Sequence, residues 1–149
     1  MRILLQRVRE ASVDVDGETV GRIGKGYLLL LCAMRGDTEE DAKRLAEKAA
    51  GLRLFDSPEG KINDRSLLDI GGDVLVVSQF TLAGDVRKGR RPDYTAAASP
   101  PEAEKLYTFF IQHMRSLGVP RVESGRFGAM MAVSLTNDGP VTLLLDTAA

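Results

Sequence analysis

Ser78-Gln79-Phe80-Thr81-Leu82 is a polar segment that directly follows a run of apolar residues. Hydroxyl and amide side chains at the end of a buried strand can project into the crevice where ligands gather in α/β proteins. Backbone N–H groups in such a segment can stabilise an oxyanion, an effect worth about 10²–10³ in rate for each donor. A polar strand end that only caps a turn is the alternative, and spacing alone leaves it open.

Asn137-Asp138-Gly139-Pro140-Val141-Thr142 is a second segment that could contact a ligand. It contains the residue types that favour turns, so a tight turn between two strands is the simpler interpretation. However, Gly139 has no Cβ and would let a ligand approach the backbone closely. Pro140 makes a cis peptide bond possible as well.

Arg87-Lys88-Gly89-Arg90-Arg91 places four positive charges in five positions, although the formal net charge of the chain is -1. The segment is either a solvated loop or a loop that contacts the phosphates of a nucleic acid without reading its sequence. The near-neutral total excludes a uniformly basic nucleic-acid-binding surface. Any attraction for a nucleic acid must therefore be local.

The chain contains one cysteine and one histidine, which removes several kinds of enzyme chemistry. Cys32 alone forms neither an intrachain disulfide nor a Cys-pair zinc site, and His113 alone excludes a multi-histidine metal site. We therefore expect no metal and no cofactor. Cys32 lies in an apolar run and is expected to be a buried small hydrophobe. His113 lies on or beside the apolar face of a helix and is expected to be structural or exposed rather than a catalytic base.

Apolar periodicity predicts an α/β protein in which mixed β-sheets carry two main helices, within a single domain over 1–149. Strands are predicted at 1–8, 12–15, 18–23, 27–34, 52–55, 73–78, 121–123, 130–135 and 141–146. Acidic residues at 37–41 predict the start of a helix that ends at Gly51, and Pro100-Pro101 predicts one that ends at Gly118. The longest apolar run, 27–34, is far shorter than the roughly 20 residues that span a bilayer. We expect a cytoplasmic protein without membrane contact.

The two polar segments together resemble the two signature motifs of the D-aminoacyl-tRNA deacylase family. Similarity to that family extends over essentially the whole chain, through Met1-Arg2-Ile3-Leu4-Leu5-Gln6-Arg7-Val8, Leu52-Arg53-Leu54-Phe55, Gly60-Lys61, Lys88-Gly89-Arg90-Arg91-Pro92 and Gly125-Arg126-Phe127-Gly128-Ala129. Met130 departs from the family pattern, which has an acidic residue there, and Ile62-Asn63-Asp64-Arg65 matches it less closely.

The resemblance implies the three-layer fold of that family and an editing hydrolase. Such an enzyme cleaves the ester that joins a D-amino acid, or glycine, to the terminal adenosine of tRNA. Family members are homodimers whose Gly-Pro pair, here Gly139 and Pro140, is cis and reaches into the partner's pocket. There it excludes L side chains sterically, which is specificity through repulsion. The terminal ribose 2′-hydroxyl assists the attack of water, so no acid–base pair of the protein is needed.

The resemblance also implies roles for individual residues. Ser78, Gln79, Phe80 and Thr81 would form the pocket and the oxyanion donors, while Phe127, Asn137 and Thr142 would bind substrate. Our own candidates for tRNA phosphates are Arg87, Lys88, Arg90 and Arg91, and we expect no DNA partner. Two alternatives stay open: Ser78 or Thr81 acts as a covalent nucleophile, although no base is evident, or the protein is a noncatalytic tRNA-binding dimer.

Overall fold

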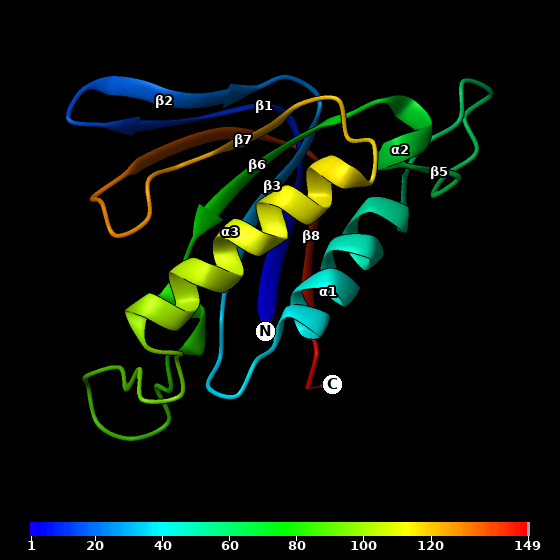
Figure 1. Ribbon diagram of the computed structural model, residues 1–149. Helices are drawn as coiled ribbons and strands as arrows, with labels where there is room; N and C mark the ends of the chain where they lie inside the picture. The colour runs from blue at the N-terminus through cyan, green and yellow to red at the C-terminus, as the bar shows by residue number, and fades with distance from the viewer. Residues whose placement is uncertain (149) are drawn as a thin grey trace.

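The computed structural model describes residues 1–148 (Figure 1). Its elements, in chain order, are β1 (Arg2–Val15), β2 (Glu18–Ile23), β3 (Gly26–Cys32), α1 (Glu39–Gly51), β4 (Arg53–Phe55), β5 (Arg65–Ser66), α2 (Leu67–Ile70), β6 (Asp73–Ser78), the 3-10 turn η1 (Phe80–Ala83), α3 (Pro100–Ser116), β7 (Val122–Ser124) and β8 (Ala132–Asp146). The predicted α/β class with two long helices is confirmed, and the short α2 is additional. Within this described part, no helix is long and apolar enough to cross a membrane.

The main sheet has the strand order β2-β1-β3-β6-β7, and β8 pairs with β1 as well. β1 is one strand of 14 residues, so the predicted break between 1–8 and 12–15 is wrong. The exposed Arg9 and Glu10 interrupt the apolar alternation at a register shift between β1 and β8, where the strand continues. The N-terminal half of β1 pairs with β3 and the C-terminal half pairs with β2.

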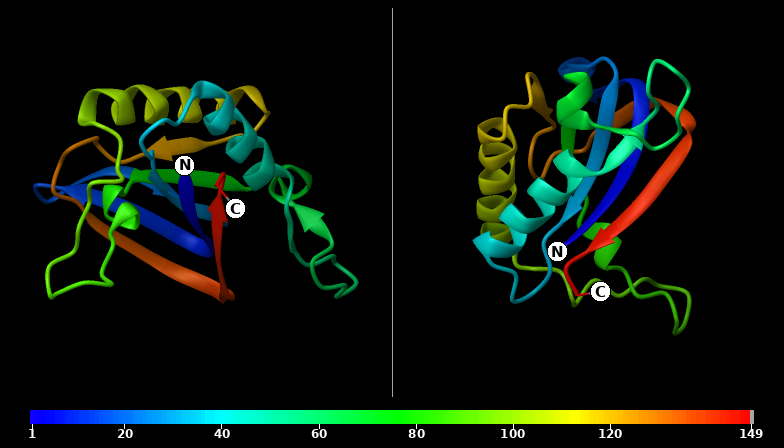
Figure 2. Two further views of the ribbon diagram at one scale, coloured as in Figure 1. Left: turned by 90° about the horizontal axis from the view of Figure 1, so that it is seen from below. Right: turned by 90° about the vertical axis from the view of Figure 1, so that its right-hand side faces the viewer.

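β3 and β6 lie side by side in parallel at the centre of the molecule and are buried on both faces, as their continuous apolar runs predict. On one face, Tyr27 and Val76 belong to the core that α1 and α3 cover. On the other face, Leu28 and Leu75 pack with Val13 and other residues of the curled β1–β2 region. The result is three layers, namely helices, central sheet and outer strands (Figure 2).

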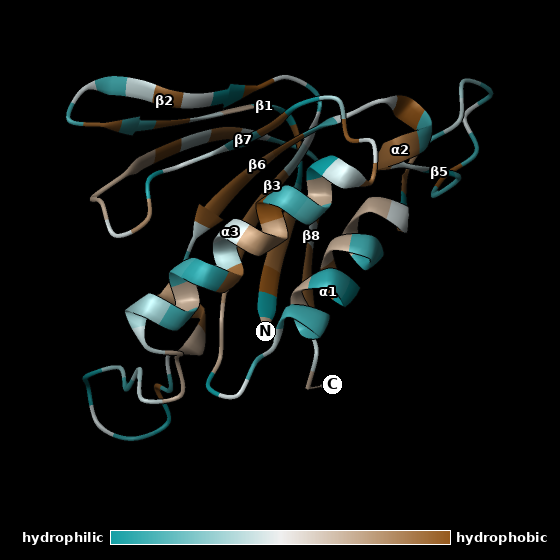
Figure 3. Ribbon diagram, in the orientation of Figure 1, coloured by the Kyte–Doolittle hydropathy of each residue, from teal (hydrophilic) through white to brown (hydrophobic). Residues whose placement is uncertain are grey.

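The two long helices cover the sheet through their apolar faces. Hydrophobic residues lie along β3 and β6, while hydrophilic residues lie on the faces of α1 and α3 that point away from the sheet (Figure 3). α1 begins after Thr38, whose side chain accepts a hydrogen bond from the Asp41 amide in a capping box. His113 Nε2 of α3 lies 3.2 Å from Glu47 Oε1 of α1, so this histidine joins the helices, as expected of a structural residue.

β8 runs unbroken from Ala132 to Asp146, so the predicted pair of strands joined by a tight turn is wrong. Both of its halves pair with β1 in the same antiparallel direction, with Thr142 opposite Gln6 and Asn137 opposite Val8. Residues 138–141 therefore stand opposite Arg7 alone and bulge out of the strand. Turn-forming residues produce a bulge here because the chain keeps the same partner strand on both sides.

Candidate functional site

A mostly apolar cavity of about 930 Å³ opens at the C-terminal ends of β3 and β6. Its walls come from the ends of these strands, from residues before and at the start of α3, and from 127–131. The charged residues in the lining are Arg35 and Glu102. Among residues 1–148, no group of three His, Cys, Asp or Glu side chains could hold a metal ion.

The 78–82 segment forms one wall of this cavity through Ser78, Gln79 and Phe80. β6 ends at Ser78, and the Gln79 amide donates to the Leu31 carbonyl at 2.7 Å before η1 begins. Within the described chain, the amide N–H groups of Phe80 and Thr81 have no acceptor, because they open a helical turn. Thr81 does not line the cavity, and its hydroxyl accepts a hydrogen bond from the Gln79 side chain.

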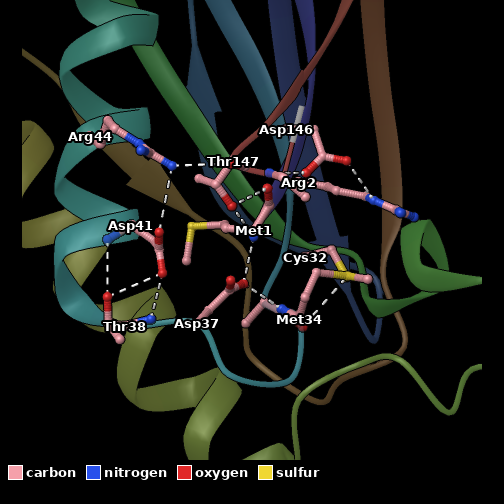
Figure 4. A network of polar contacts seen from close by, with 12 residues as sticks. Met1, Arg2, Cys32, Met34, Asp37, Thr38, Asp41, Arg44, Asp146 and Thr147 are labelled. Atoms are coloured by element: carbon pink, nitrogen blue, oxygen red, sulfur yellow. Dashed lines mark hydrogen bonds and ion pairs between the residues drawn. The ribbon is translucent and has the colours of Figure 1, made fainter.

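Two side chains, those of Arg2 and Cys32, contact carbonyl oxygens of η1, and Figure 4 shows Arg2 beside Asp146. Arg2 Nη1 donates to the Leu82 carbonyl at 2.9 Å, and Arg2 Nε lies 3.0 Å from Asp146 Oδ2. The Cys32 thiol lies 3.5 Å from the Phe80 carbonyl and is 1% exposed, so the expected burial of Cys32 is confirmed. Burial raises the pKa of the Cys32 thiol, which keeps it protonated and unreactive at neutral pH.

Aromatic and sulfur-containing side chains form another part of the lining. The Phe127 ring is tilted against the Tyr107 ring at a centroid distance of 5.8 Å, and the Tyr107 hydroxyl donates to the Val76 carbonyl. Met130, the departure from the family pattern, lines the cavity although it is 92% exposed. Sequence reasoning missed Tyr94, Tyr107 and Met131 as lining residues. Tyr107 could have been noticed as an aromatic residue on the face of a predicted helix. That pattern is also typical of ordinary core residues, so it does not distinguish a cavity-lining residue.

The 137–142 segment lies away from this cavity, and none of its residues lines it. Asn137 Nδ2 donates to Thr142 Oγ1 at 3.0 Å, and the Val141 amide donates to Asn137 Oδ1 at 2.9 Å. These hydrogen bonds link the two ends of the bulge. The Gly139-Pro140 peptide bond within it is cis.

The distance between Ser78 and the bulge at residues 138–141 follows from the strand register. Ser78 aligns through Leu31 and Ile3 with Leu145, whereas the bulge stands opposite Arg7. Four residues along β1 and three strand spacings across the sheet amount to roughly 20 Å. Figures 1 and 2 accordingly show the loop that follows η1 and the β4–β5 hairpin, which Arg7 contacts, at opposite ends of the molecule. One chain therefore does not bring its two polar segments together.

The basic loop, residues 84–93, adjoins the cavity. Asp85 and Asp93 pair through their backbones at its base, and the Tyr94 ring meets the Phe80 ring edge-on at 5.1 Å. Arg87 donates twice to the Asp85 carboxylate, at 2.9 and 2.7 Å. The hydrogen bonds from Arg87 lower the pKa of Asp85 to about 2, so this pair stays ionised.

The other cations of the basic loop differ from Arg87. In the part of the chain that the structure describes, Lys88, Arg90 and Arg91 form no ion pair with a carboxylate. All three are exposed. Of the four residues predicted to contact phosphates, Lys88, Arg90 and Arg91 are therefore accessible to an anionic partner. The charge of the fourth, Arg87, is balanced by Asp85.

Comparison with known proteins gives consistent matches over the whole chain. A family profile described as D-Tyr-tRNA(Tyr) deacylase matches residues 4–146. A D-aminoacyl-tRNA deacylase from Thermomicrobium roseum is 59% identical over 148 residues, which cover 99% of this chain and 95% of the relative. A protein of the same name from Thermosipho melanesiensis is 55% identical over 147 residues, which cover 99% and 97%.

Solved structures agree with these matches. The c-Myc DNA unwinding element binding protein has a TM-score of 0.95 and 38% identity, with full coverage of both chains. A probable eukaryotic D-amino acid tRNA deacylase has a TM-score of 0.80 and 23% identity, with 97% coverage of each chain, which shows the shared fold alone. From the family match and the near-complete alignments, this chain belongs to the D-aminoacyl-tRNA deacylase family, hydrolases that act on the ester bond of aminoacyl-tRNA.

Proposed function

We propose that the cavity beside the 78–82 segment binds the aminoacyl-adenosine end of a D-aminoacyl-tRNA and that η1 stabilises the oxyanion of ester hydrolysis. The observation that supports this most strongly is the pair of unpaired amide N–H groups, those of Phe80 and Thr81, at the start of η1 beside the cavity. Preorganised donors of this kind lower the barrier without a titrating side chain.

The 2′-hydroxyl of the terminal ribose takes the role that an acid–base pair has in other hydrolases. The Cys32 thiol is kept neutral by burial, and His113 is engaged with Glu47 between the helices. Among residues 1–148, the Ser78 hydroxyl forms no hydrogen bond with a carboxylate or imidazole that could activate it, and the one histidine is engaged with Glu47, which disfavours the covalent alternative. The substrate hydroxyl lies next to the ester and can orient or deprotonate the attacking water.

Stereochemical selection requires a second copy of the chain. Gly139 and Pro140 lie roughly 20 Å from Ser78 by strand spacing, so they serve the cavity of a partner subunit. β8 supplies a surface for that partner, because the described strands pair with one of its edges and none of its residues is fully buried. Leu135, Leu143 and Leu144 are exposed along it.

In such a dimer the backbone of Gly139 and Pro140 occupies the space that an L side chain would need. A D-amino acid directs its side chain elsewhere, and glycine has no side chain to exclude, so glycyl-tRNA is a substrate too. The exposed Lys88, Arg90 and Arg91 contact tRNA phosphates beside the cavity entrance.

The decisive experiment compares hydrolysis of D-Tyr-tRNA, L-Tyr-tRNA and Gly-tRNA by one preparation. We expect cleavage of the D and glycyl esters and protection of the L ester. A D-Tyr-tRNA that ends in 2′-deoxyadenosine should react about 10²–10⁴-fold more slowly, the usual contribution of a positioned proton-transfer group. Cleavage of that substrate at the full rate would exclude 2′-hydroxyl assistance, and D-Tyr-tRNA hydrolysis no faster than in buffer would leave a noncatalytic tRNA-binding protein.

Phe80→Pro tests the oxyanion donors directly, because proline deletes one N–H yet is accepted at the first position of a helical turn. Gln79 before it has φ -141° and ψ 74°, outside the α region that a following proline disfavours. We expect kcat to fall about 10²–10³-fold. Phe80→Ala, which keeps the amide but removes the ring that lines the cavity, is the matched control, and its kcat should fall much less than that of Phe80→Pro.

A further inference from the structure

Arg7 connects the bulge of β8 to a different part of the fold. Its side chain is 13% exposed and extends from β1, with Nε donating to the Asp138 carbonyl at 2.9 Å. Nη1 of the same guanidinium donates to the Leu54 carbonyl in β4 at 2.5 Å. A Cβ on Gly139 would lie 3.2 Å from Nη2. The guanidinium therefore contacts the peptide just before Gly139, and Arg9 Nε lies 3.5 Å from Oδ1 of the same Asp138.

Phe55, next to Leu54, supports the guanidinium from one side. Its ring is 2% exposed, and its centroid lies 5.9 Å from Arg7 Cζ. A cation beside an aromatic ring in a dry environment is attracted to the ring electrons and loses rotational freedom. The Asp64 amide donates to the Phe55 carbonyl at 2.9 Å, which fixes this residue within the β4–β5 hairpin.

Tyr27 supports Phe55 from β3. The two rings stack with centroids 5.2 Å apart and an interplanar angle of 21°. The Tyr27 hydroxyl is buried and has no hydrogen-bond partner among residues 1–148, so this tyrosine contributes its ring rather than a polar contact. A continuous path of contacts therefore runs from the central sheet through Phe55 and Arg7 to the backbone at Asp138.

We propose that Phe55 is a positioning residue for stereochemical selection, which acts through Arg7 on the Gly139-Pro140 segment; this rests on the function proposed above for that segment. Phe55 does not line the cavity, so it acts without contact to the reacting ester. Loss of its ring would let the guanidinium turn and the bulge shift, and the space reserved against L side chains would open.

An ordinary core role makes a different prediction. If Phe55 contributed only packing, its truncation would lower stability and reduce D and L hydrolysis in the same proportion. A positioning role changes the ratio of the two rates, and a gain of L hydrolysis does not arise from a smaller folded fraction.

The test measures D-Tyr-tRNA and L-Tyr-tRNA hydrolysis, with thermal unfolding, for the full chain carrying Phe55→Leu. We expect the L-to-D rate ratio to rise about tenfold, within the range that loss of one cation–aromatic contact allows. Phe110→Leu is the matched control, because Phe110 is a fully buried phenylalanine of the same core without contact to Arg7. It should lower the unfolding temperature and leave the ratio unchanged.

Phe55→Met, which fills similar space with a flexible side chain, replaces Phe55→Leu if the latter does not fold. A ratio equal to that of the parent protein in the folded Phe55 variant overturns the proposal. Gly139→Ala separates this outcome from failure of the proposed function. If Gly139→Ala raises the ratio and Phe55→Leu does not, only the role of Phe55 is refuted; if Gly139→Ala also leaves the ratio unchanged, selection by the segment itself is refuted.

Discussion

Arg2 and Leu82 lie 80 positions apart in the chain and are joined by a hydrogen bond of 2.9 Å from the guanidinium to the carbonyl oxygen. Arg2 is itself oriented by Asp146, at the end of β8 (Figure 4). The contact thus ties η1, which carries the proposed oxyanion donors, to the first residue of β1 and the last residue of β8. Its loss should affect catalysis more than binding.

Arg2→Met is expected to lower kcat for D-Tyr-tRNA about tenfold, with a smaller change in KM. Hydrogen bonds from charged groups contribute about 1.5–3 kcal/mol, and η1 would become mobile without this one. Arg2→Lys should recover part of the rate, since one ammonium group cannot reproduce both contacts. Arg44→Met is a suitable control, because Arg44 also donates to a backbone carbonyl, but that carbonyl belongs to Thr147 and not to η1. Equal effects of Arg2→Met and Arg44→Met would contradict a role in positioning η1.

Phe127→Ala should raise KM about 5- to 150-fold and change kcat little. This range corresponds to the roughly 1–3 kcal/mol that stacking of a base on an aromatic ring contributes. Phe127 also packs against Tyr107, so thermal unfolding must be measured in parallel. Phe127→Leu keeps much of that packing without the ring, and a KM like that of the parent protein in this variant would exclude base stacking.

If the basic loop contacts tRNA, the salt dependence of tRNA binding should differ between variants of its individual cations. Arg90→Ala and Arg91→Ala should each reduce the slope of log K against log salt by about 0.7–0.9, the value for one lost phosphate contact. Arg87→Ala should change the slope little, because Asp85 already neutralises this cation. Binding of uncharged tRNA between about 50 and 200 mM salt measures these slopes. Slopes equal to that of the parent protein in all three variants would place tRNA away from the loop.

Asp146 predicts a loss of stability in acid. Burial raises the pKa of its carboxyl, but hydrogen bonds from the Ala148 amide and the Arg2 guanidinium lower it by more, and the result lies below the usual value. The carboxylate therefore stabilises the fold above the unfolded-state pKa of about 3.9. That contribution disappears as the pH falls through the lower folded-state pKa.

Urea unfolding of the parent protein and of Asp146→Asn measures this effect. The difference in unfolding free energy should stay constant from neutral pH to about pH 5 and shrink below about pH 4. A difference that persists undiminished to about pH 2 would mean that Asp146 acts through packing and not through its charge.

The local sequence pattern was sufficient to predict the central elements of the fold. The continuous apolar run of β3 predicted a strand buried on both faces, and the acidic start of α1 predicted a capped helix, since neighbours along the chain decide both features. The course of β1 and β8 was not predictable in this way. Whether Arg9 ends a strand, or 137–142 makes a hairpin, depends on which strand lies alongside.

The sequence by itself determined which residues could carry chemistry: two polar segments, an isolated cluster of cations and few titratable side chains. The tertiary structure decided how they are arranged. Pairing of both halves of β8 with β1 placed Gly139 roughly 20 Å from Ser78, and a contact within the basic loop neutralised Arg87. Register and side-chain pairing arise from contacts between distant residues, so residue types and local spacing do not contain them.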